Sequence, residues 1–249
     1  MKLTEWSDRK NNRLTSSEPF NATIGVFDGI HLGHQRLLHR LAEYGEKSLV
    51  VTFRNNPKEV LRPELFGGHL ISWNEKLRRL EALKVDEVLW IDFSPEFATM
   101  TADVFLETLQ KLYSLRNLVL GWNFRLGRHP GLGVDDLEQI FKNGSIEVID
   151  PVFYQQVPVS SSEVRKAVHN GHLSLAARLL GRPYRLEVPE AEYVSGGFWA
   201  PRKAWNQVLP KPGKYPIFAG QKSVLTVEKD GLFWESPLGP VAKEIIFEE

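Results

Sequence analysis

Two histidines, His31 and His34, stand three residues apart where an apolar segment gives way to an amphipathic one. Residues 23–27 predict a short β-strand, and the segment that begins at about Gly33 predicts a helix. Side chains three residues apart lie on the same side of a helix, so both imidazoles can face one ligand. The backbone N–H groups and the dipole at a helix N-terminus attract anions, and Gly33 lets an anion approach the backbone closely. This pattern predicts a phosphate site.

A metal site is the alternative chemistry for two histidines, and it would need further ligands at a fitting spacing. The chain has no cysteine, which also excludes disulfides and thiol catalysis. The remaining histidines form no such cluster in the sequence: His39, His69, His129, His169 and His172. We therefore predict no metal ligands among the protein side chains.

A second candidate anion site is the run Ser160-Ser161-Ser162, which is followed by Arg165. A serine N-cap with an exposed arginine explains this pattern equally well on local grounds. However, a cation in the first turn of a helix opposes the helix dipole, and a bound anion would explain its presence. Ser161, Ser162 and Arg165 are therefore candidates for phosphate contacts.

Composition limits the kinds of partner that the chain can have. Its 249 residues suffice for one large and one small domain, and 42% hydrophobic with 25% charged residues is typical of a globular protein. Because 31 basic residues balance 31 acidic ones, no overall charge attracts nucleic acid or an anionic membrane. No apolar run approaches the length of a signal peptide or a membrane span. We expect a cytoplasmic protein, and the composition does not predict its oligomeric state.

Strands and helices alternate regularly in the first three quarters of the sequence. Apolar runs at 48–53, 87–92, 116–120 and 145–150 predict further strands, and amphipathic segments between them predict helices that Ser72 and Thr101 cap. This order predicts right-handed crossovers and a parallel, Rossmann-like sheet that binds ligands at the carboxyl ends of its strands. The predicted fold class is α/β, and the first domain covers residues 1–184.

Beyond residue 184 the composition changes. Helical periodicity vanishes, while proline, glycine and tryptophan accumulate. Short strands are predicted at 215–219, 222–227, 232–235 and 244–247, with a hairpin turn at Lys229-Asp230-Gly231. Residues 185–249 therefore predict a second, small β-rich domain.

The stretch G-V-F-D-G-I-H-L-G-H that begins at Gly25 resembles the HxGH signature of nucleotidyltransferases. Its form is most similar to the FMN adenylyltransferase half of bacterial FAD synthetases. The segment V-S-S-S-E-V-R from Val159 resembles the second signature of that family, I-S-S-T-x-x-R. The segment G-W-N-F-R-L-G from Gly121 is similar to the family's G-x-[DN]-F-x-F-G, with Leu126 in place of the second phenylalanine.

One segment departs from that family. T-F-R-N-N-P, which begins at Thr52, stands where the family has T-F-x-P-H-P, so Asn55 replaces a proline and Asn56 replaces a histidine. Asparagine can donate a hydrogen bond to a phosphate oxygen but cannot carry a positive charge. The resemblance extends from Thr23 to about Tyr184.

The resemblance implies transfer of AMP from ATP to FMN, which gives FAD and pyrophosphate with Mg²⁺ bound to ATP. The implied catalytic residues are His31, His34 and Arg165. The implied contacts with ATP are Gly25, Phe27, Asp28, Gly33, Ser161 and Ser162, and those with the flavin are Asn56, Asn123 and Phe124.

The bacterial enzymes of this family usually continue into a riboflavin kinase barrel, in which a G-F-P-T-A-N segment holds Mg-ATP. The best counterpart here, W-A-P-R-K-A from Trp199, has Arg202 and Ala204 where that segment has threonine and asparagine. The resemblance therefore implies a degenerate kinase module without riboflavin kinase activity. Two alternatives stay open: a nucleotidyltransferase for another phosphate-bearing acceptor, and a catalytically impaired regulatory protein that binds flavin or nucleotide.

Overall fold

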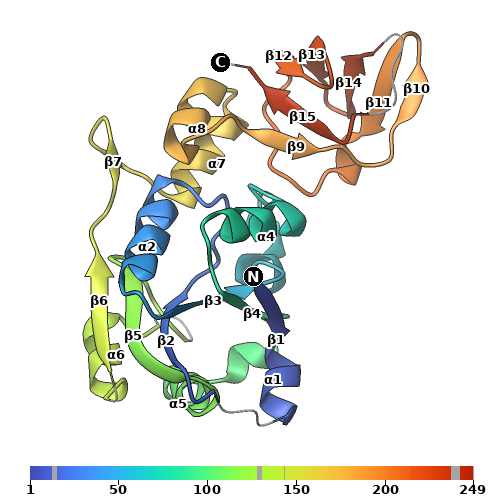
Figure 1. Ribbon diagram of the computed structural model, residues 1–249. Coiled ribbons are helices and arrows are strands. Elements are labelled where there is room, and N and C mark those ends of the chain that lie inside the picture. Colours follow the sequence, from blue (N-terminus) through green and yellow to red (C-terminus); the bar gives the residue numbers. More distant parts are fainter. Residues whose placement is uncertain (13–15, 128–130, 143, 237–241, 249) are drawn as a thin grey trace. The chain divides into compact units, whose positions relative to one another are not determined.

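The computed structural model describes residues 1–12, 16–127, 131–142, 144–236 and 242–248 (Figure 1). The chain divides into two compact units, residues 1–66 with 77–152 and residues 67–76 with 153–249. The predicted domain boundary after residue 184 differs from this division, which places residues 67–76 and 153–184 in the second unit. The predicted boundary stays a prediction. No helix in the described part of the chain is long and apolar enough to cross a membrane.

The first unit is built on a sheet in which every paired neighbour is parallel. Its strands, in spatial order, are β1 (Lys2–Glu5), β4 (Glu87–Ile91), β3 (Lys47–Phe53), β2 (Pro19–Ile24), β5 (Ser114–Gly121) and β6 (Ser145–Ile149). The central strands are almost entirely buried, as the apolar runs in the sequence predict. The predicted parallel, Rossmann-like sheet is confirmed.

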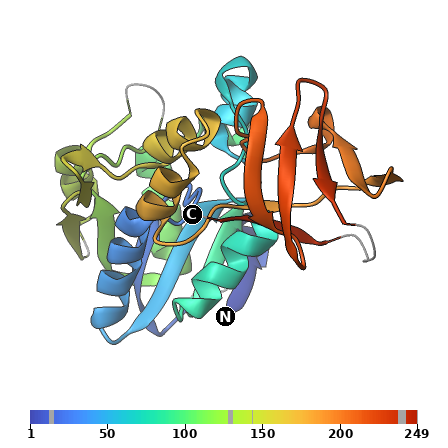
Figure 2. The same ribbon diagram turned by 90° about the horizontal axis from the view of Figure 1, so that it is seen from above.

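Helices cover both faces of this sheet (Figures 1 and 2). Helix α2 (Leu32–Glu43) buries Leu37, Leu38 and Leu41 on one face. Three helices cover the other face: α1 (Trp6–Asn12), α5 (Ala102–Leu112) and α6 (Val134–Ile140). The short elements at the carboxyl ends of the strands are α3 (Pro57–Leu61) and the 3₁₀ helices η1 (Pro63–Leu65) and η2 (Phe97–Thr99).

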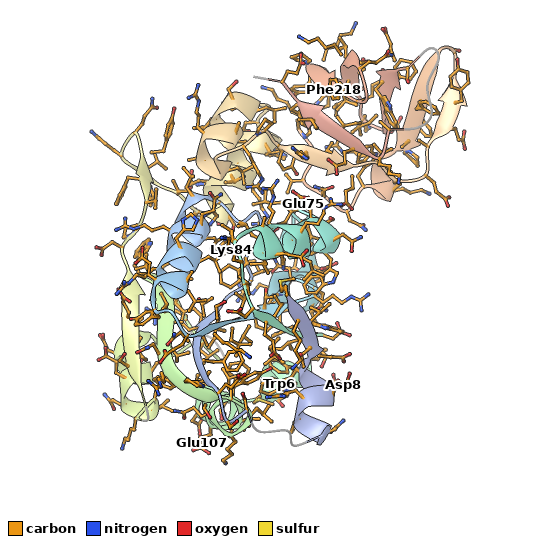
Figure 3. The ribbon with its side chains drawn as sticks, in the orientation of Figure 1. Trp6, Asp8, Glu75, Lys84, Glu107 and Phe218 are labelled. Carbon is orange, nitrogen blue, oxygen red and sulfur yellow. The ribbon has the colours of Figure 1, made fainter. Side chains whose placement is uncertain are left out.

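The N-terminal residues form structure that the sequence did not predict. Strand β1 pairs with β4, and helix α1 directs Trp6 toward the sheet while Asp8 points away (Figure 3). The Trp6 ring stacks on Phe105 at 5.1 Å between ring centroids and is almost completely buried. A four-residue strand shows too little alternation to be recognised, and the partner of Trp6 lies far away in the sequence.

The second unit contains two helices, α7 (Ser161–His169) and α8 (Leu173–Leu180), and a two-stranded hairpin, β7 (Phe153–Tyr154) with β8 (Val157–Pro158). Gly181 ends α8 in the left-handed conformation, which glycine adopts without strain. The unit also holds an antiparallel sheet in the order β10 (Glu192–Val194), β11 (Gly197–Pro201), β14 (Gly231–Glu235), β13 (Lys222–Val227), β12 (Gly213–Phe218), β15 (Glu244–Phe247) and β9 (Arg185–Glu187). Strands β9, β10 and β11 were not predicted, but the β-rich character of residues 185–249 is confirmed.

Residues 67–76 join the second unit through backbone hydrogen bonds. The N–H of His69 donates to Asn206 O at 2.9 Å, and the N–H of Val208 donates to His69 O at 2.8 Å. Between these bonds, the amide of Gln207 donates to the carbonyls of Leu70 and Arg185. Helix α4 (Trp73–Ala82) follows, so its first turn belongs to one compact unit and the rest to the other.

Candidate active site

The turn between β2 and α2 is tight and conformationally strained. Phe27 and Ile30 adopt φ values of +50° and +40°, in the left-handed region that disfavours residues with a Cβ, and Gly29 lies between them at +90°. Each such non-glycine residue costs on the order of 1–3 kcal/mol. Burial offsets this cost, since only 1% of Phe27 and of Ile30 is exposed. The strand ends at Ile24, three residues before the predicted end at Phe27, and the strained turn follows it.

Gly25 and Phe27 interlock within this turn. A Cβ atom added to Gly25 would lie 3.1 Å from Cε2 of Phe27, so the phenyl ring occupies the space that a larger residue would need. The same ring lies 5.1 Å from that of His34, measured between centroids. These two residues therefore shape the turn from the protein interior, and the adjacent Asp28 is buried as well. Their predicted contacts with ATP stay predictions.

The two histidines lie side by side at the start of α2. His31 is the N-cap, and its Nδ1 atom accepts a hydrogen bond from the backbone N–H of His34 at 3.3 Å. The two imidazole rings stack with centroids 3.7 Å apart and an angle of 18° between their planes. Because Nδ1 accepts, this hydrogen bond assigns the proton of a neutral His31 ring to Nε2, which can donate to a phosphate oxygen. The first turn of α2 contains no acidic side chain that would compete with an anion.

A cavity of about 640 Å³ runs along α2 from this first turn. Its walls are one face of the helix and the end of β6 with the residues that follow: Leu32, Gln35, Arg36, His39, Arg40, Glu43, Glu147, Val148, Ile149, Asp150 and Val152. The carboxylate of Glu147 accepts hydrogen bonds from Arg40 Nε at 2.8 Å and from Tyr44 Oη at 2.6 Å. Burial raises the pKa of Glu147, but these two hydrogen bonds outweigh it and keep the pKa below its ordinary value.

Both asparagines after β3 form side-chain hydrogen bonds with the backbone. Oδ1 of Asn56 accepts from the N–H of Lys58 at 3.0 Å, and the Glu59 carboxylate accepts from the N–H of Asn56 at 3.4 Å, which is a capping box for α3. The side chain of Asn55 pairs with the backbone of Phe93. The buried Asn56 therefore uses its carbonyl oxygen in the cap, and its Nδ2 group is the donor suited to a ligand.

The predicted flavin contacts after β5 lie in a hydrogen-bonded turn. The N–H of Phe124 donates to Gly121 O at 2.9 Å, and the Phe124 ring packs on the core while Asn123 is exposed. Trp122, between β5 and Asn123, is 51% exposed. An antiparallel bridge between Leu126 and Leu132 closes the following loop, of which residues 128–130 lie outside the described part of the chain.

Three phenylalanines form a further apolar cluster at the carboxyl ends of β3 and β4. The ring centroids of Phe53, Phe93 and Phe97 lie 5.6, 5.8 and 6.4 Å from one another, and all three residues are partly exposed. We refer to Phe53, Phe93 and Phe97 as the aromatic wall. Phe93 and Phe97 belong to no motif and were not predicted. Their position directly after a predicted strand is the signal that could have identified them.

The serine-rich segment caps α7 in the second unit. Oγ of Ser160 accepts from the N–H of Glu163 at 3.3 Å, while Ser161 and Ser162 begin the helix. Arg165 is the fifth residue of α7, so the argument that a cation occupies the first turn is wrong. Its guanidinium donates to Gly68 O at 3.2 Å and to Ser161 O at 3.4 Å. The two predicted phosphate motifs therefore belong to different compact units.

No three histidine, aspartate or glutamate side chains gather closely enough to hold a metal ion among the residues that the structure describes. Our prediction that the protein supplies no metal ligands stays a prediction. The donors available around His31 and His34 suit phosphate oxygens, and a divalent cation would be bound through the phosphates of a nucleotide.

A parallel α/β sheet with a histidine pair at the N-terminus of its central helix defines a Rossmann-like fold of the nucleotidyltransferase type. The FAD synthetase family matches residues 14–163, and the chain belongs to this family. It is 32% identical over 171 residues to a bifunctional riboflavin kinase/FMN adenylyltransferase of Buchnera aphidicola, a match that covers 66% of this chain and 55% of that protein. A protein of the same name from Haemophilus influenzae is 33% identical over 171 residues, with 66% and 56% covered.

The chain thus spans about half the length of the curated relatives it matches. A crystal structure of a protein named macrolide-efflux protein, from Streptococcus pneumoniae, superimposes with a TM-score of 0.82. That match covers 99% of this chain and 89% of the other at 22% sequence identity. At this identity the likeness shows the fold alone.

Proposed function

We propose that this protein is an FMN adenylyltransferase, which transfers AMP from ATP to FMN and releases pyrophosphate. The observation that carries the proposal is the stacked pair His31 and His34 at the N-terminus of α2, in a chain of the FAD synthetase family. An oxygen of the FMN phosphate attacks the α-phosphorus of ATP. The bond between the α-phosphorus and the bridging oxygen breaks, and that oxygen leaves with pyrophosphate.

This chemistry needs no general base. The second pKa of a phosphate monoester is about 6, so FMN is already a nucleophile at neutral pH. The protein has to align the two phosphates and stabilise the charge that develops on the leaving pyrophosphate. His31 and His34 would donate to that charge, together with Arg165, Ser161 and Ser162. Mg²⁺, bound by the nucleotide and by water, would neutralise part of the phosphate charge.

The turn at 25–30 and the cavity along α2 would hold the nucleoside of ATP. The cavity begins at Leu32 and Gln35, next to the histidines, and its volume of about 640 Å³ lies within the usual range for small-molecule sites. Gly25, Phe27 and Asp28 would support the ATP site by fixing the turn, and Gly33 would admit a phosphate close to the helix backbone.

The flavin would bind at the carboxyl ends of β3, β4 and β5. Asn56 and Asn123 supply amide groups there, while Phe124 and the aromatic wall offer partly exposed rings for the isoalloxazine. Aromatic rings pack on flat ligands through offset or edge contacts. This arrangement would leave the FMN phosphate free to reach the centre of the sheet, where α2 begins.

We further propose that the β-rich part lacks riboflavin kinase activity. In the second unit the N–H of Arg202 donates to Asp230 O at 2.8 Å, and its guanidinium donates to Glu228 O at 3.3 Å. The arginine therefore holds a turn, and its charge would repel a metal ion. Ala204 has no group that can coordinate one.

A regulatory protein that binds flavin without turnover is the second candidate, and the presence of Asn55 and Asn56 where the family has proline and histidine favours it, because asparagine cannot carry a positive charge. Incubation with FMN and Mg-ATP, followed by chromatography of flavins and an assay for pyrophosphate, separates the candidates. We expect FAD and pyrophosphate in equal amounts, and from riboflavin with Mg-ATP no FMN and no ADP. Binding of FMN and ATP without formation of FAD would favour the regulatory protein. If only another phosphate-bearing acceptor gave a product, that acceptor would replace FMN as the proposed substrate.

A further inference from the structure

The side chain of Asn55 extends the pairing of β3 with β4 beyond the ends of both strands. The regular ladder ends where the N–H of Arg54 donates to Ile91 O. Beyond it, Nδ2 of Asn55 donates to Phe93 O at 2.7 Å, and the N–H of Phe93 donates to Oδ1 of Asn55 at 2.7 Å. A single side chain thus satisfies both backbone groups of a residue 38 positions away.

This double hydrogen bond fixes one member of the aromatic wall. Phe93 packs edge-on against Phe53, with an angle of 84° between ring planes, and lies 5.8 Å from Phe97. Phe97 begins η2, and its N–H donates to Oγ of Ser94. The backbone of Phe93 is therefore the point at which the loop after β4 is attached to the loop after β3.

We propose that Asn55 is a positioning residue for the flavin ring, because it holds the aromatic wall in the geometry that the isoalloxazine contacts. This inference rests on the proposed function. Asn55 lies at the carboxyl end of the sheet, where ligands bind in folds of this kind, and the three rings of the aromatic wall are partly exposed there while Phe53 and Phe97 also pack on the core. Its neighbour Asn56 caps α3, so the two consecutive asparagines fix the loop after β3 and, through Phe93, the loop after β4.

The order of the sheet predicts which substrate is affected. Asn55 joins the loops after β3 and β4, whereas α2 begins after β2 on the other side of β3. Loss of the Asn55 side chain should therefore loosen the flavin surface and leave the histidine pair in place. We expect Asn55→Ala to raise the Kd and the KM for FMN about tenfold. The KM for ATP should change less than twofold and kcat at saturating FMN less than about threefold.

The experiment compares Asn55→Ala and Asn55→Asp with the unaltered protein, by flavin fluorescence titration and by steady-state kinetics. Aspartate keeps the acceptor for the Phe93 N–H but turns a carboxylate toward Phe93 O, so its loss of FMN affinity should equal or exceed that of alanine. Tyr113→Phe is the matched control. It removes a buried hydrogen bond of 2.6 Å to Glu87, at the opposite end of β4, and should lower Tm without changing FMN affinity.

The outcomes separate this inference from the proposed function. If the unaltered protein binds FMN without making FAD, a tenfold higher Kd for FMN in Asn55→Ala still supports the positioning role. Suppose instead that FAD forms. If Asn55→Ala then changes the KM for FMN and the KM for ATP equally, or changes neither KM, the positioning role is refuted while the adenylyltransferase activity stands. An effect of Tyr113→Phe on FMN affinity as large as that of Asn55→Ala would reduce the role to general stability.

Discussion

His31 combines two roles whose effects can be measured separately. Its Nδ1 atom caps α2 by accepting from the N–H of His34, and its Nε2 atom is placed to donate to phosphate. Replacement by alanine removes both functions. Replacement by asparagine supplies a good N-cap residue, since its carbonyl oxygen can accept from the same backbone N–H, but offers nothing at the reach of Nε2.

The structure allows both magnitudes to be worked out. Loss of an N-cap side chain costs about 1 kcal/mol, and in a protein of this size that lowers Tm by about 3 °C. Loss of one transition-state donor lowers kcat by about 10²–10³-fold, which corresponds to about 2.7–4 kcal/mol. We therefore expect His31→Ala to lose both stability and turnover. His31→Asn should keep its Tm within about 1 °C and lose turnover to the same extent.

Thermal unfolding tests the capping role of His31, and the FMN-to-FAD assay tests its role as a donor. The affinity for FMN serves as an internal control. Affinity for FMN should change little in either variant, because the histidines would contact the phosphates of ATP. A kcat of His31→Asn within about threefold of the unaltered protein would refute the donor role. An unchanged Tm in His31→Ala would refute the capping role.

Two further predictions follow from the same structure. Asn56→His can keep the cap of α3 through Nδ1 while its ring is neutral, as His31 does for α2, and exchanges that cap for a positive charge when the ring is protonated. It should raise kcat/KM for FMN, and more so below neutrality because imidazole titrates near pH 6.5; a flat or lower value would mean that the pocket is adapted to asparagine. Burial raises the pKa of Glu87, but hydrogen bonds from Tyr113, Thr4 and Lys2 outweigh burial and hold the pKa below its ordinary value. The ionised carboxylate therefore stabilises the folded protein above the pKa of the unfolded carboxyl, about 4.3, and this stabilisation is lost as the pH falls. The decrease in Tm between about pH 5 and pH 3 should therefore be smaller for Glu87→Gln than for the unaltered protein. Equal decreases in the two proteins would contradict this explanation.

Local features of the sequence predicted the sheet and the first phosphate motif. The run at 48–53 is apolar and β-branched, and its burial in the sheet follows from that alone. The proximity of the two histidines was predicted from the spacing of residues three apart on a helix, and it holds although His31 is the N-cap and lies just outside α2. The stack of the two rings needed the structure, since the capping geometry of His31 orients its ring.

Features that depend on distant partners could not be predicted. Segment 67–76 joins the second unit because His69 and Gln207 pair, and their sequence separation leaves no periodic signal. Arg165 was assigned to the wrong helical turn because the N-cap proved to be Ser160 and the helix begins at Ser161. The end of β2 at Ile24 was likewise misplaced by three residues, because the strained turn at Phe27 cannot be recognised from apolar residue types.

The two asparagines after β3 show how a departure from a family pattern can keep its structural purpose. A proline at position 55 would restrict the loop through its own ring, whereas Asn55 restrains it through two hydrogen bonds to Phe93. At position 56 an imidazole could cap α3 as Asn56 does, because a neutral ring also offers one acceptor atom. The two substitutions therefore exchange one means of fixing the loop for another, and asparagine at position 56 gives up the positive charge that a histidine gains on protonation. Loss of that charge bears on the affinity for the FMN phosphate, and it leaves the histidine pair on α2 unchanged. Lost catalysis does not follow from the departure, so the regulatory alternative has to rest on a measurement of turnover.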